Sequence, residues 1–274
     1  MAFVELTECL VRALSTDLKR NASQLNGDIL VAIVWQMHRV NCLHKSKYWN
    51  PSMNKPVELI IFDWDGTLFD SVGQIVASLL FAAQQFAQPL TADAAKSIIG
   101  LGLPEVAQRL FPQVPELHTE ILQCYAEHYV ANSKGDVWFD GVADMLNGLR
   151  EAGLQLAVAT GKSRKGLDRV LAQTQSQTLF VTTRAASETK SKPHPLMLEE
   201  ILTETGVSAE RAIMVGDTSY DLEMARNIAM PRIGVSYGVH TAETLRQYQP
   251  LAIADDVPSL QQHLLQYVDL KQVI

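Results

Sequence analysis

The sequence predicts an α/β protein with a doubly wound parallel sheet of the Rossmann type and an inserted α-helical domain. Two observations lead to this prediction. From residue 57 onward, short apolar runs alternate with segments of helical periodicity, and strands separated by helices form parallel sheets. Residues 72–136 interrupt the alternation with helical patterns alone, which indicates an insertion after the first strand.

The expected strands are short, apolar and rich in β-branched residues. They lie at 57–62, 154–160, 211–216, 231–236 and 251–255, with a further short strand within 178–183. Helical patterns occupy the intervals, at 142–152, 163–173, 194–205, 219–228, 241–247 and 258–267. In such sheets ligands bind beyond the carboxyl ends of the strands. Polar residues follow or end three of these strands: Asp63, Thr160 and Asp217.

The domain organisation follows from these patterns. We expect residues 53–71 and 137–274 to form the core domain, and residues 72–136 to form a helical cap over the carboxyl ends of the strands. Residues 1–52 carry a net charge of +2, against −9 for the remainder, and have no sustained period. We expect them to be a dispensable or disordered extension, or the product of a start assigned too far upstream. A genuine amphipathic helix over residues 3–20 is the rival interpretation.

Composition excludes several classes of protein. The net charge of −7 argues against a general nucleic-acid surface. The three cysteines are far apart in the sequence, so neither a disulfide framework nor a zinc site is expected. No apolar run reaches the roughly 18 residues that cross a bilayer, and the first residues do not read as a secretory signal. We therefore expect a cytoplasmic protein without a membrane partner.

The stretch "LIIFDWDGTLFDS" places two acids, Asp63 and Asp65, directly after the first apolar strand. Side chains alternate along a strand, so the two carboxylates would share one side if the strand continued. Two carboxylates at so short a distance disfavour each other's ionisation, because their negative charges repel. A hard divalent cation is the simplest group to offset that repulsion.

Three further motifs follow in order along the chain. They are "ATGKS" with Thr160 and Gly161, "SKPHP" with Lys192, and "GDTSYD" with Asp217 and Asp221. With "DWDGT", this ordered set resembles the haloacid dehalogenase-like hydrolases, specifically the phosphoglycolate phosphatase-like members with a helical cap after the first strand. The resemblance covers about residues 55–268.

The resemblance implies a Mg²⁺-dependent phosphomonoester hydrolase that acts on a small phosphorylated metabolite. Asp63 would be the nucleophile that forms an aspartyl-phosphate, and Asp65 the general acid and base. Lys192 would neutralise the phosphoryl charge, with Asp221 orienting that lysine.

Further roles follow from the same resemblance. Mg²⁺ would bind the Asp63 carboxylate, the Asp65 main-chain carbonyl and Asp217. The implied phosphate-binding residues are Gly66, Thr67, Thr160, Gly161 and Lys192. The expected specificity loop of the cap is Gly100, Leu101, Gly102 and Leu103.

The segment "ATGKSRKGLDRVL" leads to two further local predictions. Thr160 is expected to cap the following helix as well as to bind phosphate. Lys162, Arg164 and Lys165 are interpreted as a solvated helix face.

One other function on the same motifs stays open, because a sugar-phosphate mutase of the β-phosphoglucomutase type shares them. A non-catalytic phosphate-binding protein is disfavoured, since it would have lost Asp63, Asp65 or Lys192 and all three are present. A haloalkanoic dehalogenase is also disfavoured, because it needs no acid at the place of Asp65.

Overall fold

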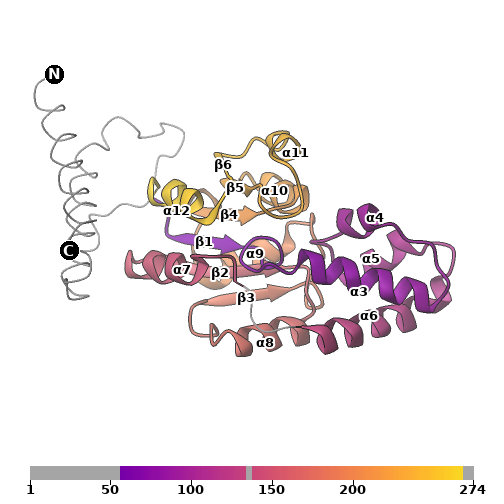
Figure 1. The fold of residues 1–274 in the computed structure, drawn as a ribbon. Coiled ribbons are helices and arrows are strands. Elements are labelled where there is room, and N and C mark those ends of the chain that lie inside the picture. The colour runs from indigo at the N-terminus through magenta and orange to yellow at the C-terminus, as the bar shows by residue number, and fades with distance from the viewer. Residues whose placement is uncertain (1–55, 134–137, 268–274) are drawn as a thin grey trace, which may run out of the picture. The chain divides into compact units, whose positions relative to one another are not determined.

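The computed structural model describes residues 56–133 and 138–267 (Figure 1). Within them, six parallel strands form one sheet in the order β3-β2-β1-β4-β5-β6. Their bounds are β1 (Leu59–Phe62), β2 (Gln155–Thr160), β3 (Thr182–Ala185), β4 (Ala212–Gly216), β5 (Arg232–Val235) and β6 (Ala252–Ala254). The predicted fold class is confirmed. The further short strand expected within 178–183 is β3, which begins later, at Thr182, and ends at Ala185. Its pairing with β2 starts with Thr182 opposite Ala157.

The central strand shows why the sheet is covered on both faces. All four residues of β1 are buried, and successive side chains point to opposite faces. Ile60 and Phe62 pack with α7 (Val142–Glu151), α8 (Arg164–Gln173) and α12 (Val257–Leu265). Leu59 and Ile61 pack on the other face, with α9 (Leu196–Thr205) and α10 (Ser219–Arg226). Continuous apolar strands of this kind are typical of parallel sheets with helices on both sides.

Short elements complete the core. The 3₁₀ turn η3 (Ala209–Arg211) leads into β4, and α11 (Ala242–Arg246) lies between β5 and β6. Among the residues the structure describes, no helix is long and apolar enough to cross a bilayer.

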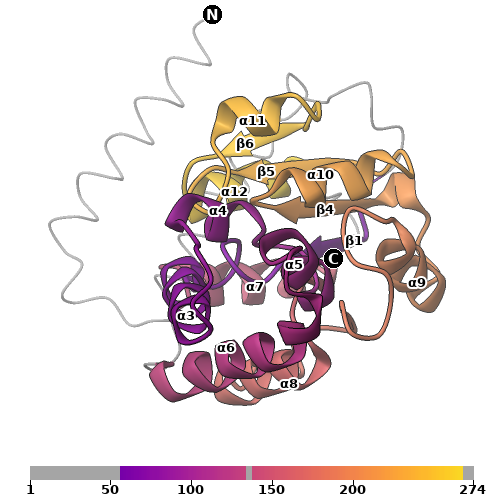
Figure 2. The ribbon, with the colours of Figure 1, turned by 90° about the vertical axis from the view of Figure 1, so that its right-hand side faces the viewer.

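The insertion consists of α3 (Val72–Gln85), α4 (Ala92–Ser97), α5 (Leu103–Leu110), η2 (Pro115–Leu117) and α6 (His118–Asn132). It contains no strand in the described residues 72–133. Its helices bury an apolar core of their own, in which Leu79, Ile98 and Val106 take part. Figure 1 shows these helices beyond the ends toward which the strands of the sheet point, and Figure 2 views the protein from that side.

Two of the predicted domain boundaries cannot be placed on this fold. The proposed extension of residues 1–52 lies outside the described residues, and so does the expected junction at residues 136 and 137.

Candidate active site

The site forms where three neighbouring strands end. Strand β1 pairs with β2 on one side and with β4 on the other. Asp63 directly follows β1, Thr160 is the last residue of β2, and Asp217 directly follows β4. All three side chains are buried. Parallel strands carry their carboxyl ends to one edge of the sheet, so the topology alone brings these residues together.

The carboxylate of Asp63 has one engaged and one free oxygen. Its Oδ1 atom accepts a hydrogen bond from the Trp64 backbone N–H at 2.7 Å and lies 2.7 Å from Lys192 Nζ. Its Oδ2 atom is buried and has no hydrogen-bond partner among the described residues. Burial raises the pKa of Asp63 well above its usual value, although the Lys192 charge opposes the shift. Oδ2 is therefore the oxygen available for chemistry.

Lys192 is a buried cation between two carboxylates. Its Nζ atom also lies 2.6 Å from Asp221 Oδ1. Asp221 is held in turn by Thr218, whose hydroxyl donates to Oδ2 at 2.6 Å and whose backbone N–H donates at 3.1 Å. The bond from the Thr218 N–H, together with the one that the Asp221 backbone N–H donates to Thr218 Oγ1 at 3.4 Å, forms the capping box that begins α10. Burial lowers the pKa of Lys192, but Asp221 and Asp63 raise it more, so the ammonium stays charged.

Asp217 is fixed by the loop that follows β1 and by the loop before α11. Thr67 Oγ1 donates to Asp217 Oδ1 at 3.0 Å, and the Val239 backbone N–H donates to Oδ2 at 2.8 Å. Burial and the neighbouring Asp221 raise the pKa of Asp217 to about 7, against these two hydrogen bonds. Gly66 has φ +80°, and a Cβ there would lie 2.2 Å from Asp217 Oδ2. Only glycine permits both this turn and this close approach.

The carboxylates suit a hard divalent cation. One oxygen each from Asp63, Asp217 and Asp221 lie within 4.8 Å of one another. The three carboxylates and Lys192 together carry a formal charge of −2 in a buried site, and oxygen is the donor that Mg²⁺ prefers. The cluster contains Asp63 and Asp217 of the expected ligand set and adds Asp221. The ligand expected from Asp65 is its main-chain carbonyl, and its carboxylate is engaged elsewhere.

Asp65 Oδ1 accepts a hydrogen bond from Ser71 Oγ at 2.5 Å and lies 2.8 Å from Lys162 Nζ. Both side chains of this ion pair are only 10% exposed. The interpretation of Lys162 as part of a solvated helix face is therefore wrong. Lys162 precedes α8 and lies in the turn after β2, where its side chain reaches back to Asp65. Burial lowers the pKa of Lys162, but Asp65 more than offsets this and the pKa is raised.

The other two cations of the predicted solvated face are Arg164, which forms ion pairs, and Lys165, which is exposed. Arg164 forms ion pairs with Glu188 at 2.5 Å and with Asp168 at 3.2 Å. Lys165 is exposed, as expected.

The turn after β2 also corrects the expectation for Thr160. Its Oγ1 atom accepts a hydrogen bond from the Lys162 backbone N–H at 3.2 Å. The residue that caps α8 is Ser163, whose side chain accepts from the Gly166 N–H. The polypeptide must pass through Gly161 before it can start the helix, and this leaves Thr160 too far from the first turn to cap it.

The cap loop rests on this turn and on the Lys192 loop. A Cβ at Gly161 would lie 2.6 Å from Gly100 O and 2.7 Å from Leu101 O. The Gly102 N–H donates to Ser191 Oγ at 2.8 Å. Gly100 has φ +102°, a conformation that side chains rarely allow. Three of the four residues expected as a specificity loop, Gly100, Leu101 and Gly102, thus approach the core through backbone atoms.

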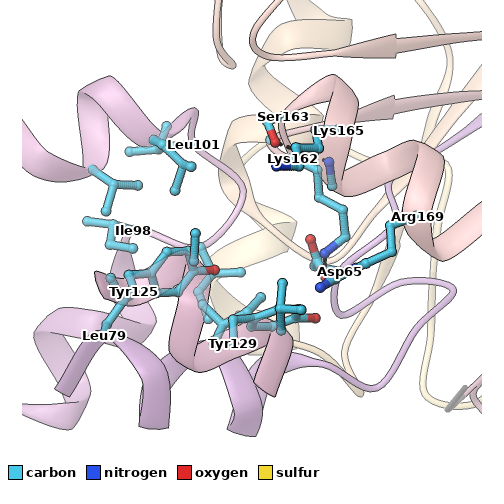
Figure 3. A pocket seen from close by; sticks show the side chains of 18 of the residues that line it. Asp65, Leu79, Ile98, Leu101, Tyr125, Tyr129, Lys162, Ser163, Lys165 and Arg169 are labelled. Atoms are coloured by element: carbon cyan, nitrogen blue, oxygen red, sulfur yellow. Dashed lines mark hydrogen bonds and ion pairs between the residues drawn. The ribbon is translucent and has the colours of Figure 1, made fainter. Parts of the chain in front are cut away.

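A cavity of about 670 Å³ lies between the cap and the core, with Asp65 in its lining (Figure 3). Gly100, Leu101 and Leu103 also line it. Figure 3 shows Lys162, Arg169 and Asp65 gathered at one end, and Leu79, Ile98 and Tyr125 toward the other. Sequence reasoning missed Tyr125, Tyr129 and Arg169, because their direction depends on how α6 and α8 face each other across the cavity.

Comparison with known proteins agrees with this geometry. The sequence pattern of the haloacid dehalogenase-like hydrolase family matches residues 60–235. The probable phosphatase IndB of Dickeya dadantii is 33% identical over 205 residues, which cover 72% of this chain and 89% of IndB. The phosphoglycolate phosphatase of Agrobacterium fabrum is 32% identical over 216 residues, covering 74% and 90%. The fold is similar to that of a hydrolase from Pseudomonas syringae, with a TM-score of 0.72, 22% identity, and coverage of 78% of this chain and 100% of that one.

Proposed function

The chain belongs to the haloacid dehalogenase-like hydrolases, and from this membership we propose that it is a Mg²⁺-dependent phosphomonoester hydrolase that acts through an aspartyl-phosphate. The observation that carries the proposal is the free Oδ2 atom of Asp63 in a buried cluster of carboxylates beside Lys192. The phosphatase names of the two similar proteins support the same reaction class.

In the first step, Asp63 Oδ2 attacks the phosphorus atom, and the bond from phosphorus to the ester oxygen breaks. The leaving oxygen takes a proton from Asp65, so an alcohol departs and Asp63 carries the phosphoryl group. In the second step, Asp65 takes a proton from water, whose oxygen attacks phosphorus. Inorganic phosphate leaves and the Asp63 carboxylate is restored.

Other residues of the chain stabilise the transferred group. Lys192 neutralises part of the phosphoryl charge, and Asp221 keeps its ammonium in place. The Thr160 hydroxyl and the Gly161 backbone N–H are the donors that we assign to phosphoryl oxygens. The Gly66 and Thr67 N–H groups instead donate to Phe69 O and Trp64 O, which fixes the turn after β1. Ser71 and Lys162 hold the Asp65 carboxylate at the cavity, where the leaving group would lie.

A bound Mg²⁺ would neutralise charge and polarise the phosphoryl group. The residues that would hold it are Asp63 and Asp217, with Asp221 beside them and the Asp65 main-chain carbonyl completing the expected set.

The test is hydrolysis of p-nitrophenyl phosphate by wild type and by Asp63→Asn. The amide is nearly isosteric but a poor nucleophile, so the variant should keep its melting temperature and lose turnover by at least about 10³-fold. EDTA should silence the wild type, and added Mg²⁺ should restore it. Near-normal hydrolysis by the variant, or activity that survives thorough chelation, would contradict the proposal. Release of inorganic phosphate in proportion to substrate consumed distinguishes a hydrolase from a mutase, which returns the phosphoryl group to a hydroxyl.

A further inference from the structure

The cavity beside Asp65 lies on the side of the reaction where the leaving group departs. Asp65 is one of the residues that line it, whereas Asp63, Lys192 and Asp217 are not. If Asp65 protonates the leaving oxygen, the rest of the leaving group must occupy this space. The residues that line the cavity therefore indicate which kind of leaving group it can bind. This inference rests on the function proposed above.

At the Asp65 end of the cavity, one cation has no anionic partner within the part of the chain that the structure describes. Arg169 lines the cavity, and its Nε and Nη1 atoms are buried without a hydrogen-bond partner among the described residues. Lys162 is already paired with Asp65. Glu127, the other described carboxylate of the lining, is exposed and accepts from Gln123. Buried guanidinium N–H groups left unpaired are costly, so Arg169 is suited to an oxyanion brought by a ligand.

Tyr129 supports both cations of this end. The Lys162 Nζ atom lies 5.1 Å from the centre of its ring, and the Arg169 guanidinium carbon lies 5.3 Å from it. Cations within about 6 Å of an aromatic face are attracted to it. Tyr129 thus keeps Arg169 close to the Lys162–Asp65 pair, near the reacting oxygen.

The remaining wall is apolar and comes from the cap. It is formed by Ile75, Leu79, Ile98, Ile99, Leu101 and Val106. A volume of about 670 Å³ falls in the range of roughly 300–1,000 Å³ that is typical of pockets for drug-sized ligands. A two-carbon leaving group such as glycolate would leave most of this apolar space unfilled.

We propose that the substrate is the phosphate monoester of a hydroxycarboxylic acid with an apolar side chain. The carboxylate lies close to the ester oxygen and binds Arg169, and the side chain packs against the cap. Of the cations described at that end, one is unpaired, and this suits a monoanionic carboxylate better than a second, dianionic phosphoryl group. Lys165 also lines the cavity, but it is exposed and Figure 3 places it beside Ser163.

The test compares four esters with wild type: p-nitrophenyl phosphate, 2-phosphoglycolate, 2-phenylethyl phosphate and the phosphate monoester of 3-phenyllactate. The last combines a carboxylate with an aromatic side chain. Its kcat/KM should exceed those of 2-phosphoglycolate and 2-phenylethyl phosphate by at least tenfold. In Arg169→Met, which keeps an apolar stem, the KM for the 3-phenyllactate ester should rise at least tenfold. The kcat/KM for 2-phenylethyl phosphate should stay within about threefold of the wild-type value. Arg169→Lys should recover part of the loss, and Arg150→Ala, an exposed cation on α7, should change nothing.

The outcomes separate this inference from the proposed function. If wild type hydrolyses none of the four esters, the phosphatase assignment itself fails. If p-nitrophenyl phosphate is hydrolysed but the carboxylate brings no advantage, the substrate class is wrong. An equal loss on all esters in Arg169→Met would show that Arg169 only supports the fold.

Discussion

Lys162 Nζ lies 2.8 Å from Asp65 Oδ1, in an ion pair that is almost completely shielded from solvent. The pair joins the turn after β2 to the turn after β1, and it holds the proposed acid and base at the edge of the cavity. Lys162 is thus a positioning residue for Asp65, although it need not touch the phosphoryl group.

Replacement of Lys162 by alanine should lower kcat for p-nitrophenyl phosphate by about tenfold or more, because Asp65 loses one of its two holding contacts. The loss should stay below the ~10²–10⁴-fold that general acid–base catalysis supplies, since Ser71 still binds Asp65. Steady-state kinetics of Lys162→Ala, Lys162→Arg and the exposed control Lys96→Ala would check this. Unchanged kcat in Lys162→Ala, or no recovery in Lys162→Arg, would count against the positioning role.

Gly161→Ala should prevent the cap loop from resting on the core. The added Cβ would lie 2.6 Å from Gly100 O, a separation from backbone that real Cβ atoms essentially never show. Activity on every ester should fall by at least tenfold, while the melting temperature changes little, because the cap and the sheet each keep their own apolar core. Gly148→Ala, within α7 and with only an ordinary contact to Gln261, is the matched control. Full activity in Gly161→Ala would show that this close approach is not needed.

Leu103→Ala should change substrate preference more than it changes basal activity. Leu103 lines the cavity from the start of α5 and is half-buried, so its truncation should be tolerated by the fold. Apolar contacts of this size discriminate by roughly 10–200-fold for each methylene. The ratio of kcat/KM between 2-phenylethyl phosphate and 2-phosphoglycolate should therefore shift by at least tenfold. Val181→Ala, at an exposed apolar residue outside the cavity, should leave the ratio unchanged.

His240 should make the protein less stable as the pH falls below about 6.5. Its Nδ1 atom accepts a hydrogen bond from the Ser219 N–H at 2.9 Å, which a protonated ring cannot do. Burial, together with Lys96, lowers the pKa of His240 from 6.5, against the opposing charge of Asp221. The unfolded state therefore binds a proton that the folded state resists, and stability is lost as the pH falls through the lowered pKa.

Urea unfolding between pH 7.5 and 5 would measure this effect. Wild type should lose up to about 1.4 kcal/mol per pH unit more than His240→Asn, whose amide oxygen can accept the same bond without titrating. Asp217, with its pKa raised to about 7, contributes with the opposite sign, but it is present in both proteins and cancels in the comparison. Parallel pH profiles for the two proteins would exclude His240 as the source.

Much of the fold and of the candidate site could be predicted because it depends on local patterns. Apolar runs the length of a strand, separated by amphipathic helices, leave a parallel sheet as the consistent arrangement. Once the sheet is parallel, residues at the carboxyl ends of neighbouring strands must meet, which brings Asp63, Thr160 and Asp217 together. No knowledge of side-chain direction was needed for either step.

The remaining features depend on how distant segments pack. Lys162 has the sequence context of a solvated helix start, and only the approach of the β1 turn gives it Asp65 as a partner. Arg169 and Tyr129 lie 40 positions apart on α8 and α6, and their contact exists only because the cap is docked over the sheet. Helical periodicity shows which side chains share a face of a helix, but it does not show which element that face packs against. In this protein the packing of the cap helices opposite the core determines which side chains line the cavity.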